Sequence, residues 1–505
     1  MQKELLITSE TSVNDRNNKG EIPVALDEEW DDGVAIVLRA HGEKSNFKLI
    51  DINTDLKKSK SKIGLWTIDK ILWPCCLTIC IMVIFSSGVS VFCMEDGKND
   101  KDACESSHTR NCYNRDIYFY DSCGNPEYLA KACGQNGTCS NGKCIPTCGK
   151  TFGGFQVEIT YSIQQTNDGG YIVAGDTESY GSGSDDFWVL KIDASGNKTW
   201  ALPYGGIDYE SAKSIQQTND GGYIVTGETE SSSGIWALKL DDDGGVAWQK
   251  RYGNFGEGDG SSIKQTTDGG YIVAGNINFV SNTYSPGIIV LKINDNGDLI
   301  WEKTYGEIKG GQANDIQQTT DGGYIVTGTT PGSKSELLVL KLDESGNTQW
   351  YKEFKGDDYD IGSSIQQTSD GGYIAAGQTY SYKEKGPDVW VLKLDASGNK
   401  TWDTTFEGKF HGGASSIEKT SDGGYIVAGY TFPSPARGFD FLTLKLDSSG
   451  NQLWTKTFGG TYDDKAESIQ QTMDGGYIVA GETLSFDKGY DFWVIKLDAN
   501  GECEW

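Results

Sequence analysis

The sequence predicts an all-β protein built mainly as a seven-bladed β-propeller of four-stranded antiparallel blades, preceded by one transmembrane helix and a small disulfide-rich segment. The motif Asp-Gly-Gly-Tyr occurs seven times, starting at residues 168, 220, 268, 321, 370, 422 and 474, so its interval is always near fifty residues. A fixed period of this size indicates stacked units, because one such unit cannot hide its own apolar face. Each unit holds four short apolar runs separated by turn residues, which is typical of a propeller blade and not of the shorter coils of a β-solenoid.

Composition limits the classes of function. The 505 residues carry a formal net charge of −28, which argues against nucleic acid as a partner because its phosphates would be repelled. Only three histidines are present, at 41, 108 and 411, so a histidine-based catalytic triad or zinc site has little material. We expect neither a cofactor nor a metal ion, since an acidic, solvated surface accounts for the charge.

An uncharged segment of 24 residues runs from Ile71 to Met94. At about 1.5 Å per residue, a helix of this length exceeds the ~30 Å hydrocarbon core, which predicts one transmembrane helix over 71–94. Lysines at 57, 58, 60, 62 and 70 precede it. Because lysine-rich flanks stay in the cytoplasm, we expect a cell-membrane protein with its N-terminus inside and its C-terminal part outside. Residues 1–70 are polar, and we expect a mostly disordered cytoplasmic tail.

Eight cysteines follow the predicted helix, at 104, 112, 123, 133, 139, 144, 148 and 503. An even number, concentrated in a segment rich in glycine and asparagine on the predicted outer side, indicates disulfides. We therefore expect a cysteine-rich extracellular stalk over 95–148. A zinc site is the alternative, but the spacing does not repeat a C-x₂-C pair. The sequence leaves the pairing of these cysteines open.

The last repeat illustrates the predicted blade. Residues 468–472 form a first strand, Asp474-Gly-Gly forms a hairpin turn whose glycines accept positive φ, and 477–481 and 492–497 form two further strands. A turn at 498–501 then leads into a fourth strand that ends in Trp505. We attribute the turn aspartates to hydrogen bonds with their own backbone and not to acid–base chemistry.

The stretches KLDESGNTQW (341–350) and KLDSSGNQLW (445–454) resemble the tryptophan-docking repeat of quinoprotein-like β-propellers, and the whole unit is similar to repeats of prokaryotic surface proteins. The resemblance covers about 149–505. It implies that one tryptophan per blade stacks between neighbouring blades, namely Trp200, Trp248, Trp301, Trp350, Trp402, Trp454 and Trp505. Quinone chemistry does not carry over, because the repeats lack a vicinal cysteine pair and have one blade fewer than the usual eight of those enzymes.

Closure of the predicted ring requires both ends of the repeat region. The seventh repeat stops at Trp505, whereas residues 148–154 (CGKTFGG) match residues 454–460 (WTKTFGG) of the sixth. The segment after Cys148 therefore supplies what the last blade lacks, which avoids an open strand edge. Cys148 and Cys503 would then lie close together, and we predict a disulfide between them. Pairing of Cys148 within the stalk is the competing hypothesis.

The repeats vary in length at one place. The distance from each blade-end tryptophan to the next first-strand serine position stays at fourteen residues, as from Trp200 to Ser214, whereas the segment between the second and third strands varies. Loops that vary on a constant scaffold are where binding surfaces are usually built. Alternate connections of a blade emerge on one face, so these loops share that face with the linkers. The aromatic residues that we predict to bind ligand there are Tyr180, Phe279, Tyr284, Tyr380, Tyr382, Phe432, Phe486 and Tyr490.

We therefore expect a membrane-anchored extracellular propeller that acts in ligand recognition or adhesion, without covalent chemistry, on a carbohydrate or protein ligand. Two alternatives stay open. The first is a polysaccharide-active enzyme that uses a carboxylate pair, such as Asp185/Asp186, Asp357/Asp358 or Asp463/Asp464. The second is a structural surface protein.

Overall fold

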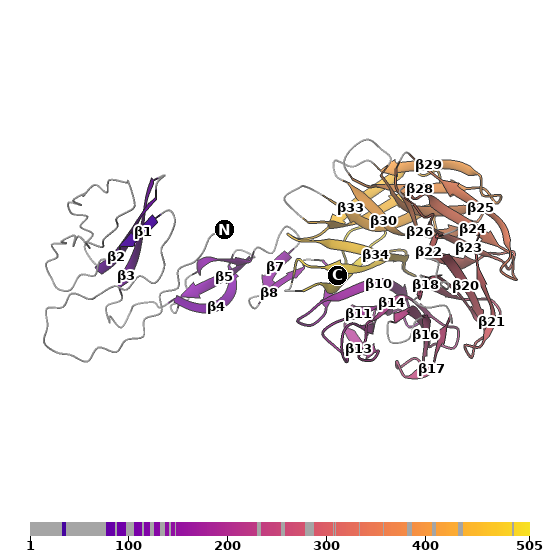
Figure 1. Ribbon diagram of the computed structural model, residues 1–505, viewed down its shortest axis with the longest axis horizontal. Helices are drawn as coiled ribbons and strands as arrows, with labels where there is room; N and C mark the ends of the chain where they lie inside the picture. The colour runs from indigo at the N-terminus through magenta and orange to yellow at the C-terminus, as the bar shows by residue number, and fades with distance from the viewer. Residues whose placement is uncertain are drawn as a thin grey trace, which may run out of the picture. The chain divides into compact units, whose positions relative to one another are not determined.

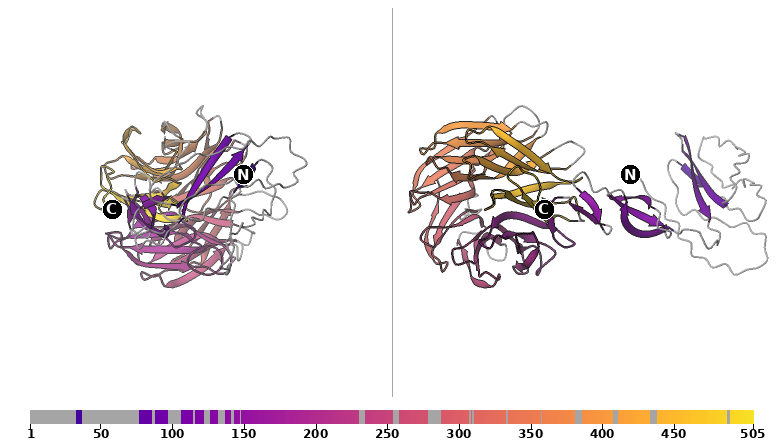
Figure 2. Two further views of the ribbon diagram at one scale, coloured as in Figure 1. Left: turned by 90° about the vertical axis from the view of Figure 1, so that its left-hand side faces the viewer. Right: turned by 180° about the vertical axis from the view of Figure 1, so that it is seen from behind.

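Seven four-stranded antiparallel blades follow one another along the chain and close into a ring, shown in Figure 1 and from behind in Figure 2. A single bridge between Glu228 and Asp259 also joins the second and third blades into one eight-stranded sheet. This computed structural model describes residues 148–505 apart from 230–233, 254–257, 278–286, 307, 309, 333, 357, 381–385, 407–410, 433–437 and 487–488. We number the blades 1 to 7 in chain order. The predicted all-β architecture of repeated four-stranded units is confirmed, and the ring is that of a β-propeller.

The first strand of every blade lies nearest the centre of the ring, and first strands of neighbouring blades contact one another, including those of blades 7 and 1. These inner strands are β10 (Glu158–Gln165), β14 (Glu210–Gln217), β18 (Gly258–Gln265), β22 (Gln312–Gln318), β26 (Asp360–Gln367), β30 (Gly412–Lys419) and β34 (Asp464–Gln471). The second strands are β11 (Tyr171–Thr177), β15 (Tyr223–Thr229), β19 (Tyr271–Ile277), β23 (Tyr324–Thr329), β27 (Tyr373–Thr379), β31 (Tyr425–Thr431) and β35 (Tyr477–Thr483).

The third and fourth strands lie progressively further out. The third strands are β12 (Asp186–Ile192), β16 (Ile235–Leu240), β20 (Gly287–Ile293), β24 (Leu337–Leu342), β28 (Asp388–Leu394), β32 (Asp440–Leu446) and β36 (Asp491–Leu497). The fourth are β13 (Lys198–Tyr204), β17 (Val246–Tyr252), β21 (Leu299–Thr304), β25 (Thr348–Phe354), β29 (Lys400–Phe406) and β33 (Gln452–Phe458), and β9 (Lys150–Phe152) takes this place in blade 7. Second and third strands are buried along both faces, so the core lies between neighbouring blades.

The chain divides into two compact units, Met1–Glu105 and Ser106–Trp505. Before residue 148 the structure gives only the positions of strands. The first unit contains β1 (Gly33–Ile36), β2 (Leu77–Phe85) and β3 (Gly88–Asp96), and the second begins with β4 (Ser106–Tyr113), β5 (Asp116–Asp121), β6 (Pro126–Lys131), β7 (Gly137–Ser140) and β8 (Lys143–Pro146). Strands β2 and β3 fall where the sequence predicts a transmembrane helix, so the helix gains no support. The tail, span and stalk lie outside the described residues and stay predictions. Within the described part of the chain, no helix has the length and apolar character that crossing a membrane requires.

The strand register separates two faces of the ring. In blade 1, Glu158 pairs with Thr177 and Thr177 with Asp186, so the linker into the blade and the loop between its second and third strands emerge at the same end. We call this end the variable face, because the loops that differ in length lie on it, as predicted. The opposite end, with the Asp-Gly-Gly turns and the turns between third and fourth strands, is called the constant face.

Each Asp-Gly-Gly-Tyr turn is tied to the third strand of its own blade by an ion pair. The lysine of the Lys-Leu/Ile-Asp/Asn motif places its Nζ 2.8–2.9 Å from the turn aspartate in all seven blades. The turn aspartate also accepts the N–H of the second glycine, as from Gly170 to Asp168 at 3.0 Å. The predicted backbone hydrogen bond is therefore present, and the sequence interpretation missed the buried lysine beside it.

The tryptophans lie between neighbouring blades, as the resemblance implies, but their rings meet the tyrosine rings at 58–65° and are not stacked on them. Each contacts the tyrosine of the next Asp-Gly-Gly-Tyr motif, with ring centroids 5.8–6.2 Å apart in all seven pairs. Each also lies over a glycine of the next blade, as Trp350 does over Gly398, where an added Cβ would come within 2.7 Å of the indole. That glycine has a φ of +77°, so both its backbone and its lack of a side chain are required.

The seam between the two ends closes as predicted. Strand β9 pairs with β36 through Lys150–Val494, Thr151–Trp493 and Phe152–Phe492, and Trp505 docks onto Tyr171 of blade 1. Cys148 and Cys503 form the predicted disulfide, with Cα atoms 5.9 Å apart. The outermost strand of blade 7 is therefore shared between the two chain ends, with the disulfide joining its parts.

Candidate functional site

The inner strands line a central tunnel, and their recurring residues cap backbone groups that face it. The N–H of Ile163 donates to Ser468 Oγ at 3.2 Å, and the N–H of Gln165 donates to Gln470 Oε1 at 2.6 Å. The same two bonds link blade 2 to blade 1 and blade 3 to blade 2. An unpaired strand edge would otherwise face the tunnel, so the Ser-Ile-Gln-Gln sequence serves the ring itself.

A β-bulge interrupts every inner strand at one position. In blade 1 the pairing runs from Thr160–Gly175 to Ser162–Ala174, which leaves Tyr161 as the extra residue. Bulges re-aim a side chain, so two successive residues of each inner strand line the tunnel. We call the seven extra residues the bulge ring: Tyr161, Lys213, Ser261, Asn314, Ser363, Ser415 and Glu467.

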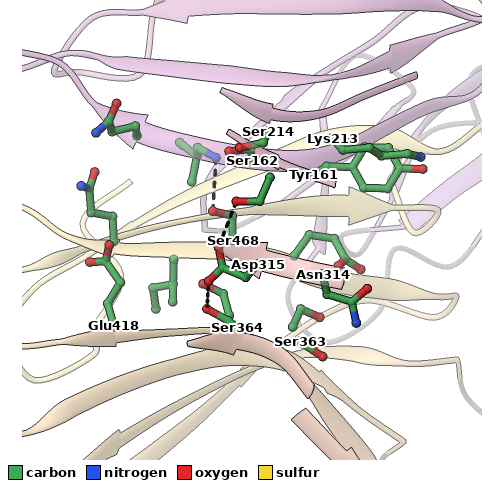
Figure 3. Close-up of a pocket in the computed structure, with 18 of the residues that line it drawn as sticks. Tyr161, Ser162, Lys213, Ser214, Asn314, Asp315, Ser363, Ser364, Glu418 and Ser468 are labelled. Atoms are coloured by element: carbon green, nitrogen blue, oxygen red, sulfur yellow. Dashed lines mark hydrogen bonds between the residues drawn. The ribbon is translucent and has the colours of Figure 1, made fainter. Parts of the chain in front are cut away.

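The tunnel contains a polar cavity of about 160 Å³, lined by the bulge ring, the serine positions next to it and the glutamine positions below (Figure 3). A cavity of this volume has room for several waters and for a small polar group. The serine positions repeat except at Asp315, which accepts hydrogen bonds from Ser262, Ser364 and the N–H of Ile365 at 3.0–3.2 Å. The bulge ring holds five residue types in seven positions, so the sevenfold repeat is broken there.

Tyr161, Lys213 and Glu467 give one side of the bulge ring its chemical character. Lys213 Nζ lies 3.9 Å from the centroid of the Tyr161 ring and 3.5 Å from Glu228 Oε1. Burial, reinforced by Glu482, raises the pKa of Glu467 to about 8, although Ser415 donates a hydrogen bond to it. Burial and the Asp176 carboxylate also raise the pKa of Tyr161, so its hydroxyl stays protonated.

Further carboxyls stand behind this side of the ring. Burial raises the pKa of Asp176 to about 7, despite Lys213 and a 2.9 Å hydrogen bond from Ser211. Burial likewise raises the pKa of Asp259 and of Glu482. A cation placed here would relieve the repulsion between these groups, whereas an anion would add to it.

Deeper in the tunnel, two glutamine positions are replaced by charges. Lys264 stands at this position in blade 3 and Glu418 in blade 6, where Glu418 accepts the N–H of Gln471 at 3.2 Å. Burial raises the pKa of Glu418 to about 7, and the ammonium of Lys264 opposes that shift. The two substitutions thus partly compensate each other in charge.

The eight predicted ligand-binding aromatics divide into three groups. Tyr180 and Tyr380 lie on the variable face with 42% and 41% of their surface exposed, and Phe432 and Tyr490 are half-buried there. Phe486 is 2% exposed and packs edge-on against Trp493, so its prediction as an exposed binding ring does not fit its burial in the core. Phe279, Tyr284 and Tyr382 lie outside the described residues.

The carboxylate pairs considered for catalysis hold backbone in place where they are described. Asp186 accepts the N–H of Ser182 at 2.7 Å, and Asp464 accepts the N–H of Gly460 at 2.8 Å and the hydroxyl of Ser485 at 2.7 Å. Asp357 lies outside the described residues.

The bulge ring was not predicted from the sequence. The available signal was that the residue before each Ser-Ile or Asp-Ile varies while its neighbours recur.

Comparison with known proteins yields only distant structural similarity. No protein-family model matches the chain, and no curated protein matches it in sequence. Among solved structures it is similar to Sqt1 from Chaetomium thermophilum, with 11% identity and a TM-score of 0.42 over 70% of this chain and 85% of that one. It is also similar to a puromycin hydrolase mutant (10%, TM-score 0.47, 68% and 53%) and to a protein of unknown function from Dyadobacter fermentans (12%, TM-score 0.39, 69% and 97%). At these TM-scores and identities the similarities carry no argument about fold or activity.

Proposed function

We propose that this chain is a membrane-anchored extracellular β-propeller that recognises a ligand, or mediates adhesion, through its variable face. The observation that carries the proposal is where the repeat is broken. Residues that build the scaffold recur from blade to blade, whereas the bulge ring that lines the tunnel and the loops of the variable face differ. A symmetric scaffold needs no such differences, and an asymmetric ligand does.

The surface location rests on the uncharged segment at 71–94 and on the extracellular pattern of cysteines. The disulfide that joins Cys148 and Cys503 supports an oxidising compartment, because such bonds persist outside the cytosol. The likeness to tryptophan-docking repeats of prokaryotic surface proteins is supported by the edge-on tryptophan–tyrosine contacts between blades, such as Trp200–Tyr223 and Trp454–Tyr477. Of the alternatives, the enzyme is the less supported, because Asp186 and Asp464 are engaged with backbone groups.

The test is a screen of the full-length protein on glycan and protein arrays, repeated with paired variants. We expect at least one ligand whose binding falls about tenfold or more in Asn314→Ala or Tyr161→Ala, which are bulge-ring positions. Met473→Ala is the matched control, because this residue is 73% exposed on the constant face. The proposal would be contradicted if ligand binding fell only in Met473→Ala, or if no ligand bound at all. Either result would favour a structural surface protein.

A further inference from the structure

Two apolar residues stand out of the variable face at neighbouring linkers. Phe155, in the linker into blade 1, is 92% exposed, and Ile207, in the linker into blade 2, is 82% exposed. They are the most exposed large apolar side chains among the residues that the structure describes. A contiguous exposed apolar patch marks a site of contact with a partner.

The loop between β11 and β12 lies between these two linkers and connects them. At one end the Tyr180 hydroxyl donates to the carbonyl of Gly153 at 2.8 Å. At the other end a Cβ added to Gly183 would lie 2.4 Å from the carbonyl oxygen of Ile207, so the loop backbone contacts that linker closely. Phe155, Tyr180 and Ile207 therefore form one surface, which we call the blade 1 patch.

The ring of Tyr180 is held in place within this patch. It stacks on Trp188 with ring centroids 5.4 Å apart and an interplanar angle of 26°, which leaves 42% of the residue exposed. An aromatic group that is already fixed loses little conformational entropy when it is covered by a partner. The patch is thus a preformed apolar anchor point.

Carboxylates lie beside the blade 1 patch. Glu178 and Asp185 flank the same loop, whereas Asp176, 4% exposed, is buried in strand β11, which leads into it. Their mutual repulsion is visible in the raised pKa of Asp185, which follows from burial and from Glu178. Lys213 is the cation near these carboxylates. It already forms an ion pair with Glu228 and a cation–π contact with the Tyr161 ring.

We propose that the blade 1 patch docks a basic peptide segment of a partner protein, whose apolar side chains cover Phe155 and Ile207 while a lysine or arginine lies over the adjacent carboxylates. This inference rests on the proposed function, because it assigns a ligand class to the same face. Charge complementarity selects the peptide: it supplies the positive charge that the carboxylates of Glu178 and Asp185 lack, which a neutral sugar does not. Ile207 also favours a peptide, since it offers no ring on which a sugar could stack.

The experiment measures binding of labelled peptides to the full-length protein by fluorescence anisotropy. The probes are a decapeptide of alternating lysine and leucine, its glutamate–leucine counterpart and a lysine–serine decapeptide. We expect the lysine–leucine peptide to bind most tightly. Its affinity should fall about tenfold or more in the double variant Phe155→Ser/Ile207→Ser and also in Glu178→Gln/Asp185→Asn, a factor that corresponds to about 1.4 kcal/mol.

The controls are Met473→Ser, 73% exposed on the constant face, and Asp295→Asn in an exposed constant-face turn. All of these positions are on the surface, so the variants are expected to fold, and their thermal transitions verify this. Equal binding of the glutamate–leucine peptide, or equal losses in the control variants, would overturn the proposal. If no peptide binds while an array glycan does, and its binding is lost in Tyr161→Ala, the peptide assignment fails and the proposed function stands. If the binding of neither peptides nor glycans depends on residues of the variable face, both the peptide assignment and the proposed function fail.

Discussion

At the scale of single residues, the seven lysine–aspartate pairs explain why two distant motifs recur together. The side chain of Lys393 is 8% exposed and its Nζ lies 2.8 Å from Asp370 Oδ2, while the carbonyl of Leu394 accepts a second bond at 3.1 Å. A buried ammonium is stable only when it is paired and hydrogen-bonded. The Asp-Gly-Gly turn therefore positions a counterion for the third strand in addition to reversing the chain.

Asp370→Asn tests this role, because asparagine retains the turn hydrogen bonds and loses the charge. We expect the free energy of unfolding at neutral pH to fall by about 1–3 kcal/mol, the usual cost of leaving a buried polar group poorly paired. The double variant Asp370→Asn/Lys393→Met removes both charges and should recover part of that loss. Urea unfolding of the three proteins gives the comparison.

The stability lost in Asp370→Asn should depend on pH. The Lys393 hydrogen bond lowers the pKa of Asp370 from 3.8 to about 2 in the folded protein. A depressed pKa gives stability that is complete above the unfolded value and is lost as pH falls through the folded one. The stability difference between wild type and Asp370→Asn should therefore shrink between about pH 4 and pH 2. A difference that stays constant over this range would contradict the ion-pair account.

At the scale of elements, the contact between blades depends on a tryptophan fitting over a glycine. Gly398 and Gly371 have nearly the same backbone, with φ of +77° and +82°, but only Gly398 lies under an indole, that of Trp350. Nothing lies within 4 Å of a Cβ added to Gly371. The two positions thus separate backbone strain from packing.

Gly371→Ala and Gly398→Ala should each lower the free energy of unfolding by about 1–2 kcal/mol, because alanine is strained at positive φ. Gly398→Ala should lose about 1–3 kcal/mol more, because its Cβ overlaps the Trp350 ring. Thermal unfolding of the two variants measures the difference. Equal destabilisation would mean that tryptophan docking contributes little to the cohesion of neighbouring blades.

Sequence reasoning reached the elements whose signal is local or repeated. The Asp-Gly-Gly turns and the four strands of a blade were predictable, because each follows from turn chemistry or from the repeat. The docking of Trp454 on the next blade was implied only by the resemblance to tryptophan-docking repeats. The bulge at Tyr161 was not, since one extra residue in a strand leaves the apolar pattern almost unchanged. The burial of Phe486 was not predictable either, because it depends on Trp493 of the neighbouring third strand.

At the scale of the whole molecule, the ring is held shut by parts from both of its ends. Strand β9 contributes only three paired residues to blade 7, whereas the other fourth strands are six or seven residues long. The indole of Trp493 donates to the carbonyl of Cys148 at 3.0 Å, and the Cys148–Cys503 disulfide spans 355 residues of sequence. A short pairing is thereby reinforced at the place where the ring is most easily opened.

Cys503→Ser should lower the free energy of unfolding by about 2–5 kcal/mol, because closing so long a loop strongly restricts the unfolded chain. Cys148→Ser should have a similar effect, and the double variant should add little to either, since all three lose the same bond. Denaturant unfolding under oxidising conditions measures these values. Additive losses would show that the two cysteines act separately.

The central claim is that recognition takes place on the variable face, and hydrogen–deuterium exchange of the full-length protein with an array-identified ligand tests it most directly. We expect slower exchange on binding in the linkers, in the loop at 178–185 and at the bulges of the inner strands. The Asp-Gly-Gly turns and the turns between third and fourth strands should be unchanged. Protection confined to those constant-face turns would contradict the account.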